Sequence, residues 1–318
     1  MSQAALDRLV FAGEAIVDLL MWVPALPERG GDMLAASAAI EVGGGFNIMA
    51  AAVRQGLPVV YAGGHGTGPW GDRVRAALAA EGIRLLRPPD PGADTGFDVA
   101  LVEAGGERTF VTALGAESLR DPGAWDLIRA RPGDAVYVSG YGLVPPGSGQ
   151  VLGAWAAGLP PGVLLFVDPG PLVAGIPAEV LGPVLARCDW VSCNHREGAL
   201  LTGSEDPAEA ARRLVRRTGQ ADVIVRSGPG GCVLAIRVSG PGTGHGLSLS
   251  HVAAPAVTAV DTTGAGDAHS GVFLAGLAAG LTVAEAVRRA NAAAALTVTR
   301  AGAATSPTRA ELDRFLGC

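Results

Sequence analysis

The chain has 318 residues and contains no lysine, so arginine provides all 24 of its basic side chains. A phosphate-binding site in this protein must therefore rely on arginine, backbone amides or a metal ion. The formal net charge at pH 7 is −6, and the composition does not suggest the basic surface that nucleic acids or anionic membranes attract. We expect neither of these as a partner.

Long hydrophobic runs and paired cysteines are also missing. No stretch approaches the roughly 18 consecutive apolar residues that a transmembrane helix needs. Charged residues interrupt the first apolar runs, at Asp7, Arg8, Glu14 and Asp18, which predicts neither a signal peptide nor a membrane span. The four cysteines fit no CxxC zinc motif and no disulfide framework, since they stand at positions 188, 193, 232 and 318. We expect reduced thiols and a cytoplasmic location.

Short β-branched runs alternate with alanine-rich helical stretches along the chain, and hydrophobic residues make up 49% of it. The expected strands are Leu9–Ala12, Val59–Gly63, Ala135–Ser139, Val163–Asp168, Trp190–Cys193 and Asp222–Arg226, with helices at Asn47–Gln55 and Gly71–Glu81. This alternation predicts an α/β fold, a doubly wound and mainly parallel sheet with helices on both faces. Ligands then bind at the carboxyl ends of the strands. No linker is evident, so we expect a single domain over residues 1–318.

One segment breaks this alternation. Phe97–Glu103 and Glu107–Ala113 mix polar residues with Val, Thr and Phe, and Gly105-Gly106 lies between them, which predicts a β-hairpin. Such a hairpin is either a lid over a substrate cleft or a surface insertion without function. Further on, the segment Ser239–Ser250 has the composition of a loop.

The strongest local motif runs from Val260 to Gly271 and contains the small residues 264–266 followed by Asp267. Small residues let consecutive backbone N–H groups converge on an anion, and a helix that begins there adds the positive end of its dipole. Asp267 is then placed to take the proton of an attacking hydroxyl while the amides hold a phosphoryl group. The alternative is an ordinary acidic residue in a first helical turn.

A second helix is expected directly after this motif. Thr282 and Glu285 form a capping-box pattern that opens a helix over Val283–Thr299. Asn291 lies among alanines in the middle of this helix, whose small side chains leave room for a flat ring. The helix is predicted either to line an adenine pocket or to pack in the core.

Two separated motifs resemble the signatures of the ribokinase-like PfkB family of carbohydrate and nucleoside kinases. Asp261–Gly271 is similar to the C-terminal signature of the family, and Gly43–Asn47, followed by Gly56 and Gly66, is similar to its N-terminal signature. Met49 departs from the small residue usual at its position. Between the motifs, two segments resemble those of the family in order and spacing, Asp168–Pro171 and Asn194–Glu197. The resemblance spans about residues 8–316 and implies a ribokinase-like fold with a small β-sheet lid.

The resemblance also implies roles for individual residues in transfer of the γ-phosphate of ATP. Asp267 is implied as the catalytic base, with an anion hole made by Gly264, Ala265 and Gly266. Glu197 and Asn194 are implied to organise Mg²⁺ and its waters, which suits the preference of that ion for oxygen; without the resemblance they would be a helix-start Asn and a solvated Glu. The residues implied to border the nucleotide are Ser227, Gly228, Gly230 and Asn291.

On the acceptor side, the resemblance implies contacts with sugar hydroxyls from Asp18, Gly43, Gly44 and Asn47. Glycine suits this place because no Cβ obstructs the approach of a polyol to the backbone. The implied lid segments are residues 14–20, 32–42 and 95–114, and closing them excludes water from the phosphoryl group. Some relatives respond to K⁺; the residues implied for such a site are Asp261 and Thr263, near the loop Arg300–Ser306. The exposed lid also suggests a homodimer formed through it.

We therefore expect an ATP-dependent, Mg²⁺-using kinase that phosphorylates a small sugar of the ribose or fructose type. The alternatives are a nucleoside kinase, in which Phe46 or Phe97 would stack on the base, and a non-catalytic sugar-binding relative. A dinucleotide-dependent oxidoreductase does not fit, because the first strand is followed by Gly13-Glu14-Ala15 in place of GxGxxG. The lack of lysine favours a neutral acceptor over a sugar phosphate. His269 replaces an aromatic residue usual in the family, and either packs or lines the cleft.

Overall fold

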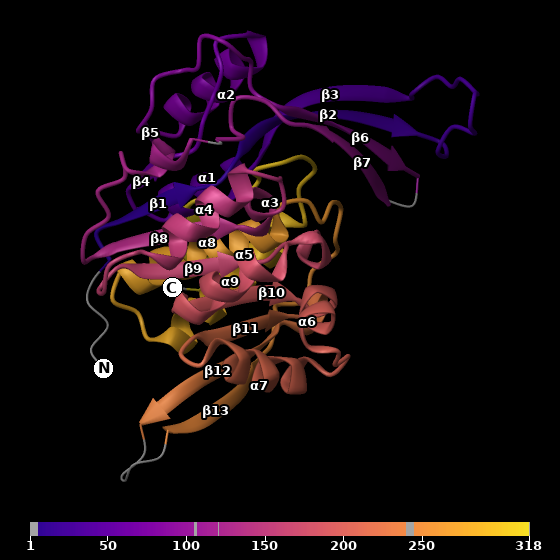
Figure 1. Ribbon diagram of the computed structural model, residues 1–318. Coiled ribbons are helices and arrows are strands. Elements are labelled where there is room, and N and C mark those ends of the chain that lie inside the picture. Colours follow the sequence, from indigo (N-terminus) through magenta and orange to yellow (C-terminus); the bar gives the residue numbers. More distant parts are fainter. Residues whose placement is uncertain (1–5, 105–106, 120, 240–244, 318) are drawn as a thin grey trace.

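The computed structural model describes residues 6–104, 107–119, 121–239 and 245–317. These residues form a large sheet in the order β13-β12-β11-β10-β9-β8-β1-β4-β5 and a small sheet in the order β3-β2-β6-β7. Figure 1 shows the small sheet projecting from one end of the large one, with helices packed on the large sheet. The predicted fold class is confirmed.

The large sheet is parallel from β5 to β11 and continues with two antiparallel strands. Its strands are β1 (Arg8–Ala12), β4 (Val59–Tyr61), β5 (Arg84–Leu85), β8 (Asp134–Ser139), β9 (Leu164–Asp168), β10 (Trp190–Asn194), β11 (Asp222–Arg226), β12 (Cys232–Ser239) and β13 (His245–Val252). The strands predicted from the sequence agree with these within two residues at each end. Because β1 lies between β8 and β4, the order reverses there, and sheets of this kind form their crevice at the carboxyl ends of the strands beside such a point.

Alternate side chains of each strand enter two separate hydrophobic cores. In β1, Leu9 and Phe11 face the core under one set of helices, and Val10 and Ala12 face the other core. The first set contains α1 (Phe46–Arg54), α2 (Pro69–Ala80), α8 (Ala265–Ala278) and α9 (Val283–Thr297), with α10 (Arg309–Leu316) packed outside α8 and α9. The second set contains α3 (Gly140–Leu143), α4 (Ser148–Ala157), α5 (Ala178–Arg187), α6 (His195–Thr202) and α7 (Pro207–Thr218). Burial on both faces explains why the strands are continuously apolar.

The small sheet consists of β2 (Ala15–Val23), β3 (Ser37–Gly44), β6 (Phe97–Glu103) and β7 (Arg108–Ala113). The predicted hairpin is confirmed as β6 and β7, whereas its Gly105-Gly106 turn lies outside the described residues. A small cluster of its own, Leu20, Ala100 and Val102, is buried on one face. Since β2 begins three residues after β1 ends, the small sheet stands at the crevice of the large one.

Two local expectations were wrong or only half right. Residues 245–250 belong to β13, where Leu247 and Leu249 alternate with serines and Leu249 packs on the core; this period of two was hidden in a glycine- and serine-rich composition. Residues 240–244 lie outside the described part. At α9, Thr282 caps Glu285 N as expected, but the Glu285 carboxylate turns to Arg288 instead of completing the box.

Candidate active site

A row of polar side chains follows the carboxyl edge of the parallel sheet. Glu14 comes two residues after β1, and Ser139, Asp168, Asn194 and Arg226 are the last residues of β8, β9, β10 and β11. The register places Ser139 beside Asp168 and Asn194 beside Arg226. Parallel strands carry all of these side chains to the same edge, at the crevice where the strand order reverses.

The first turn of α8 lies at this edge. Gly264 caps the helix with φ +71°, a left-handed conformation that glycine adopts without strain, and Ala265, Gly266 and Asp267 follow as its first three residues. First-turn amides have no carbonyl partner within their own helix, so they can bind an anion together with the helix dipole. The Ala265 amide makes a long bond of 3.3 Å to Thr262 O. The structure thus brings together the four residues predicted for catalysis.

Asp267 is held by a residue from the other end of the chain. Asn47 Nδ2 donates to Asp267 Oδ2 at 3.1 Å, while Asn47 Oδ1 accepts from Ala304 N at 3.0 Å. Asp267 is half-buried. Its burial by the surrounding protein raises its pKa to about 6. The Asn47 hydrogen bond opposes that rise in pKa, and the charge of Asp168 adds to it.

The residues predicted to organise Mg²⁺ form the start of α6. Asn194 caps the helix by accepting from Glu197 N, and the Glu197 carboxylate accepts from Asn194 N at 2.7 Å and Asn194 Nδ2 at 2.8 Å. Glu197 is buried, and its pKa is raised to about 7. Burial is the main cause of this rise, and the negative charge of Asp168 is the second. The alternative is half right, because Asn194 is the N-cap of the helix but Glu197 is buried and not solvated. The role of the pair toward Mg²⁺ stays a prediction.

An open pocket of about 540 Å³ lies beside this helix start, a size within the range of small-ligand sites. Its lining includes Ser227 and Gly228, two of the residues predicted to border the nucleotide, together with Asn194 and Arg226. Gly230 follows in the same turn. Asn291 does not line this pocket: it is buried and donates through Nδ2 to Val252 O at 2.8 Å, which ties α9 to the end of β13.

The residues predicted for the acceptor lie together on the small sheet. Asp18 of β2 lies against Gly43 of β3, so closely that a Cβ at Gly43 would be 2.0 Å from Asp18 Oδ2. Gly44 has φ +58° and leads into α1, which carries Asn47. Burial first, and then the charges of Asp98 and Glu41, raise the pKa of Asp18 to about 8. The structure therefore places all four predicted acceptor residues at the join between the small sheet and α1.

Comparison with known proteins decides the family. The chain matches the pfkB family carbohydrate kinase profile over residues 6–310. The chain belongs to the pfkB family of carbohydrate kinases. The kinase is 34% identical over 309 residues to the uncharacterized sugar kinase YegV of Escherichia coli (strain K12), covering 96% of this chain and 93% of that protein. It is 29% identical to a ribokinase of Haemophilus influenzae, over 97% and 98% of the two chains.

Solved structures agree with the fold of the kinase. The ribokinase of Arabidopsis thaliana, in complex with ribose and ATP, superposes with a TM-score of 0.76 at 22% identity and covers 98% of this chain and 99% of that one. The ribokinase of Giardia lamblia superposes with a TM-score of 0.81 at 22% identity, over 96% and 99% of the chains. Within the described residues, no helix of the kinase combines the length and the apolar character needed to cross a bilayer.

Arg226 is a site residue that sequence analysis missed. Its guanidinium bonds to Asp168 Oδ2 at 3.0 Å and to Gly266 O at 3.0 Å, and lies 3.8 Å from Glu197 Oε2. A Cβ at Gly266 would be 3.1 Å from Arg226 Nη1, so a buried positive charge stands directly behind the first turn of α8. The sequence did contain a sign of this role, because Arg226 is the last residue of an apolar strand and the chain has no lysine that could supply a positive charge at the strand end.

Two other side chains at the crevice were also missed. Glu14 is half-buried, accepts from Ser139 Oγ at 3.2 Å and has a second oxygen with no partner among the described residues. Burial raises the pKa of Glu14 to about 7. Tyr141, just after β8, is 46% exposed, and its pKa is raised by burial of the hydroxyl and then by the charges of Glu14 and Asp267. Tyr141 therefore stands beside the acids of the site.

The aromatic residues proposed to stack on a nucleobase lie elsewhere. Phe46 is buried in the core, and Phe97 packs on Trp70 with ring centroids 6.0 Å apart. His269 is buried in α8 with a pKa lowered to about 3 by burial and then by Arg226, so it packs as a neutral ring. None of these three rings is open to the crevice as a stacking surface.

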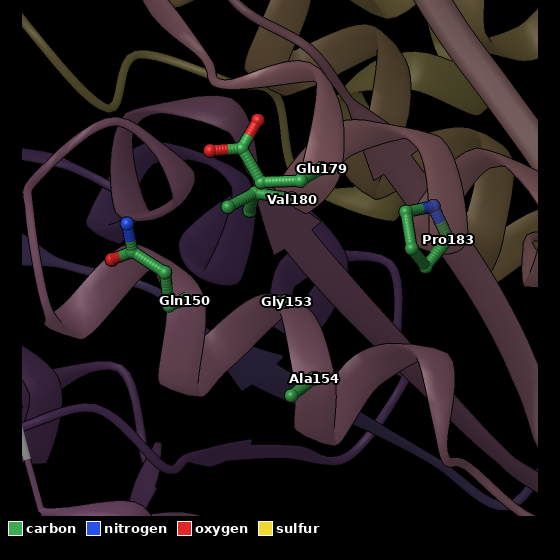
Figure 2. Close-up of a pocket in the computed structure, with 6 residues that line it drawn as sticks. All are labelled: Gln150, Gly153, Ala154, Glu179, Val180 and Pro183. Atoms are coloured by element: carbon green, nitrogen blue, oxygen red, sulfur yellow. The ribbon is translucent and has the colours of Figure 1, made fainter.

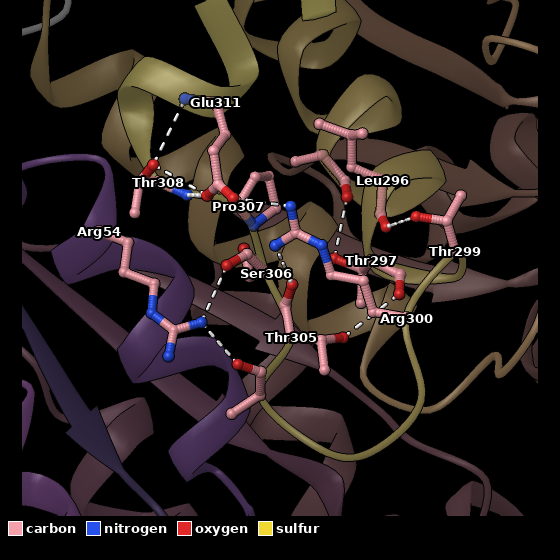
Figure 3. Close-up of polar contacts among 12 residues, drawn as sticks. Arg54, Leu296, Thr297, Thr299, Arg300, Thr305, Ser306, Pro307, Thr308 and Glu311 are labelled. Atoms are coloured by element: carbon pink, nitrogen blue, oxygen red, sulfur yellow. Dashed lines mark hydrogen bonds and ion pairs between the residues drawn. The ribbon is translucent and has the colours of Figure 1, made fainter.

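The loop Arg300–Ser306 is fixed by contacts with α1 and α10 (Figure 3). Arg54 Nη1 donates to Ala304 O at 2.5 Å and Ser306 O at 2.8 Å, and Arg300 pairs with Glu311 at 2.8 Å. The loop in turn donates from Gly302 N to Asp261 Oδ2 at 3.1 Å. The segment that supports Asn47 and Asp261 is therefore held from two helices.

A second, smaller pocket lies between α4 and α5. Figure 2 shows its lining residues on α4 and α5: Gln150, Gly153, Ala154, Glu179, Val180 and Pro183. Its volume is about 170 Å³, below the range of small-ligand sites, and it contains no residue predicted for catalysis or binding. We assign it no role in the reaction.

Proposed function

We propose that the kinase transfers the γ-phosphate of ATP to a hydroxyl of a small sugar, with Asp267 as the base. The observation that carries this proposal is the position of Asp267 in the first turn of α8, beside the first-turn amides and hydrogen-bonded to Asn47. One short segment thus offers both an anion-binding backbone and a proton acceptor.

The chemistry needs few groups from the protein. Asp267, with a pKa of about 6, is largely ionised at neutral pH and takes the proton of the acceptor hydroxyl. The hydroxyl oxygen forms a bond to the γ-phosphorus as the bond to the bridging oxygen of ADP breaks. The amides of Gly264, Ala265 and Gly266 and the charge of Arg226 stabilise the transferring group.

The nucleotide is proposed to bind in the 540 Å³ pocket at Asn194, Ser227 and Gly228. Mg²⁺ would supply charge neutralisation at the phosphates. Both Glu197 oxygens already accept from Asn194, and among the described residues no three His, Cys, Asp or Glu side chains gather as a metal site. Glu197 fits Mg²⁺ only as a group that orients water around an ATP-bound ion.

The residues around Asp261 fit a monovalent cation poorly. Asp261 Oδ1 accepts from Thr263 N, Thr263 Oγ1 and, at 2.6 Å, Arg108 Nη2, and Oδ2 accepts from Gly302 N. Burial alone would raise the pKa of Asp261, but these hydrogen bonds and the Arg108 charge outweigh it and lower the pKa. Both carboxylate oxygens of Asp261 are thus engaged by donors of the protein, and we derive no step through that ion.

The small sheet acts as the lid in this proposal, through residues 14–20, 32–42 and 95–114, and its outer face forms a homodimer. A sugar is favoured over a nucleoside because Phe46 and Phe97 are both packed in the protein. We place the activity in the cytoplasm, where ATP is available; the three described cysteines are free and buried, as reduced thiols are.

The test is an ATP-dependent phosphorylation screen over pentoses, hexoses and nucleosides with the wild type, Asp267→Asn and Asp72→Asn. Asp72 is the matched control because it also lies in the first turn of a helix, α2, but outside the site. We expect turnover of at least one sugar, a loss of about 10²-fold or more in kcat for Asp267→Asn, and no loss for Asp72→Asn. Equal kcat in wild type and Asp267→Asn removes Asp267 from the base role, and phosphorylation of nucleosides alone contradicts the sugar assignment.

A further inference from the structure

A row of carboxylates crosses the small sheet. The pairing places Glu41 of β3 beside Asp18 of β2, and Asp18 beside Asp98 of β6. Register partners in neighbouring strands point to the same face of a sheet, so the three side chains share one face. Of the three, only Asp18 was implied by the family resemblance as a residue that contacts the acceptor.

This face of the small sheet is turned toward the core domain. Arg108 of β7, on the same face by register, pairs with Asp261 at 2.6 Å, and Glu41 accepts from Ala303 N at 2.6 Å. Asp18 lies against Gly43, four residues before Asn47, and Asn47 donates to the proposed base Asp267 at 3.1 Å. The charge of Asp267 also contributes to raising the pKa of Asp18. Asp98 therefore lies at the acceptor end of the site.

Two of the three carboxylates have unused hydrogen-bonding capacity. Asp18 and Asp98 are each only 7% exposed, yet Oδ1 of each has no hydrogen-bond partner among the described residues. Burial raises the pKa of Asp98 to about 6. Two buried carboxylates side by side cost free energy unless a ligand provides donors, so the arrangement points to a ligand.

We propose that Asp98 is a second acceptor-binding carboxylate, which with Asp18 selects a sugar bearing an N–H or O–H donor at this place and rejects sugars bearing a phosphate or carboxylate. This inference rests on the proposed function and narrows its substrate class. The nearest cation on this face, Arg108, is already paired with Asp261, so an anionic substituent would meet like charges without compensation. Either a hydroxyl or a protonated amine of the sugar can supply the hydrogen-bond donor that these carboxylates require.

The experiment starts from a neutral sugar that the kinase phosphorylates. It compares kcat/KM for this sugar with kcat/KM for its amino derivative, its carboxylate derivative and its phosphate ester. The variants are Asp98→Asn, Asp98→Ala and the control Glu103→Gln. Glu103 lies on the same strand, five residues after Asp98. Because side chains alternate between the two faces of a strand, Glu103 points to the face opposite Asp98. Thermal unfolding of each variant confirms that it is folded.

For the wild type we expect the neutral or amino sugar to exceed both anionic derivatives by about 10²-fold. Asp98→Ala is expected to lose about 10- to 100-fold in kcat/KM on the preferred sugar, and Glu103→Gln less than about 2-fold. A larger loss for the amino sugar than for the neutral sugar in Asp98→Asn identifies the amine as the donor; equal losses identify the hydroxyl.

An unchanged kcat/KM in folded Asp98→Ala, or a wild-type preference for an anionic sugar, overturns the inference while leaving the kinase activity established. Absence of turnover with every sugar instead contradicts the proposed function. In that case, binding of the neutral sugar to Asp267→Asn, measured by calorimetry with and without Asp98→Ala, still decides the role of Asp98. Equal affinity in the two proteins overturns it.

Discussion

At the scale of single residues, Asn47 has a different place from the one expected. The sequence predicted that it binds acceptor hydroxyls, and this stays a prediction. In the structure its amide joins two segments, because it donates to Asp267 and accepts from the backbone of Ala304. A side chain that donates to the ionised base lowers the pKa of that base and fixes its direction. Asn47 is therefore also a positioning residue.

Asn47→Ala is expected to raise the pKa of Asp267 above about 6, since the variant removes the hydrogen bond that opposes the effect of burial. In the proposed mechanism the ionised form of Asp267 is the active one, so kcat/KM of the wild type should fall as the pH drops through about 6. In the variant this acidic limb moves to higher pH by about 0.5 to 1 unit. The measurement is kcat/KM with a turned-over sugar from pH 5 to 8.

Gln55→Ala is the matched control for this experiment. Gln55 caps the same helix, is buried and donates to Pro307 O at 2.9 Å, but does not contact Asp267. Its pH profile should keep the acidic limb of the wild type even if its stability falls. An unshifted limb in Asn47→Ala would show that the hydrogen bond to Asp267 does not tune the base.

At the scale of elements, two contacts join the small sheet to the core. Arg108 of β7 pairs with Asp261, and Glu41 of β3 accepts from the loop residue Ala303. Both partners of the Arg108–Asp261 pair are mostly buried, at 16% and 12% side-chain exposure, so solvent screens this pair less than a surface pair. If the small sheet is the lid, as proposed, the pair acts as a latch between the lid and the segment that leads into α8.

Arg108→Met is expected to weaken this latch. KM for the sugar should rise about 10-fold, with a smaller change in kcat, because the lid closes less often while the base stays in place. Amide hydrogen exchange in β6 and β7 should become faster. Arg213→Met is the control, since Arg213 pairs with Glu209 on exposed α7. Unchanged KM together with unchanged exchange in Arg108→Met would rule out a latch.

At the scale of the whole molecule, the small sheet has one face toward the site and one facing outward. Met21, Ile40 and Val111 lie on the outer face, with exposures of 38%, 44% and 71%. α2 covers only the part of this face near Phe97. Neighbouring exposed apolar side chains on an open sheet favour association with a second copy.

We expect the kinase to sediment at twice the mass of one chain at micromolar concentration, and Val111→Glu to sediment as a monomer, because a buried charge would oppose the interface. Leu127→Glu is the control. Leu127 is 55% exposed but lies outside the small sheet, so this variant should remain dimeric. A monomeric wild type in sedimentation velocity would contradict the dimer.

The sequence by itself determined the fold class, the place of the main strands and helices, and the residues of the α8 turn. These features follow from local patterns: apolar runs buried on both faces, glycines at a tight turn, and an acid at a helix start. The family resemblance extended them to Asp18 and to Asn194–Glu197, and the family is confirmed over residues 6–310.

Only the tertiary structure decided which distant charges meet. Arg226 reaches Gly266, Arg108 reaches Asp261 and Asp98 lies beside Asp18, through contacts between strands and helices far apart in the chain. An isolated arginine or aspartate has the same local pattern whether it is solvated or buried. Its role depends on strand register and on the dehydration that raises or lowers its pKa, and both arise only when the sheets pack.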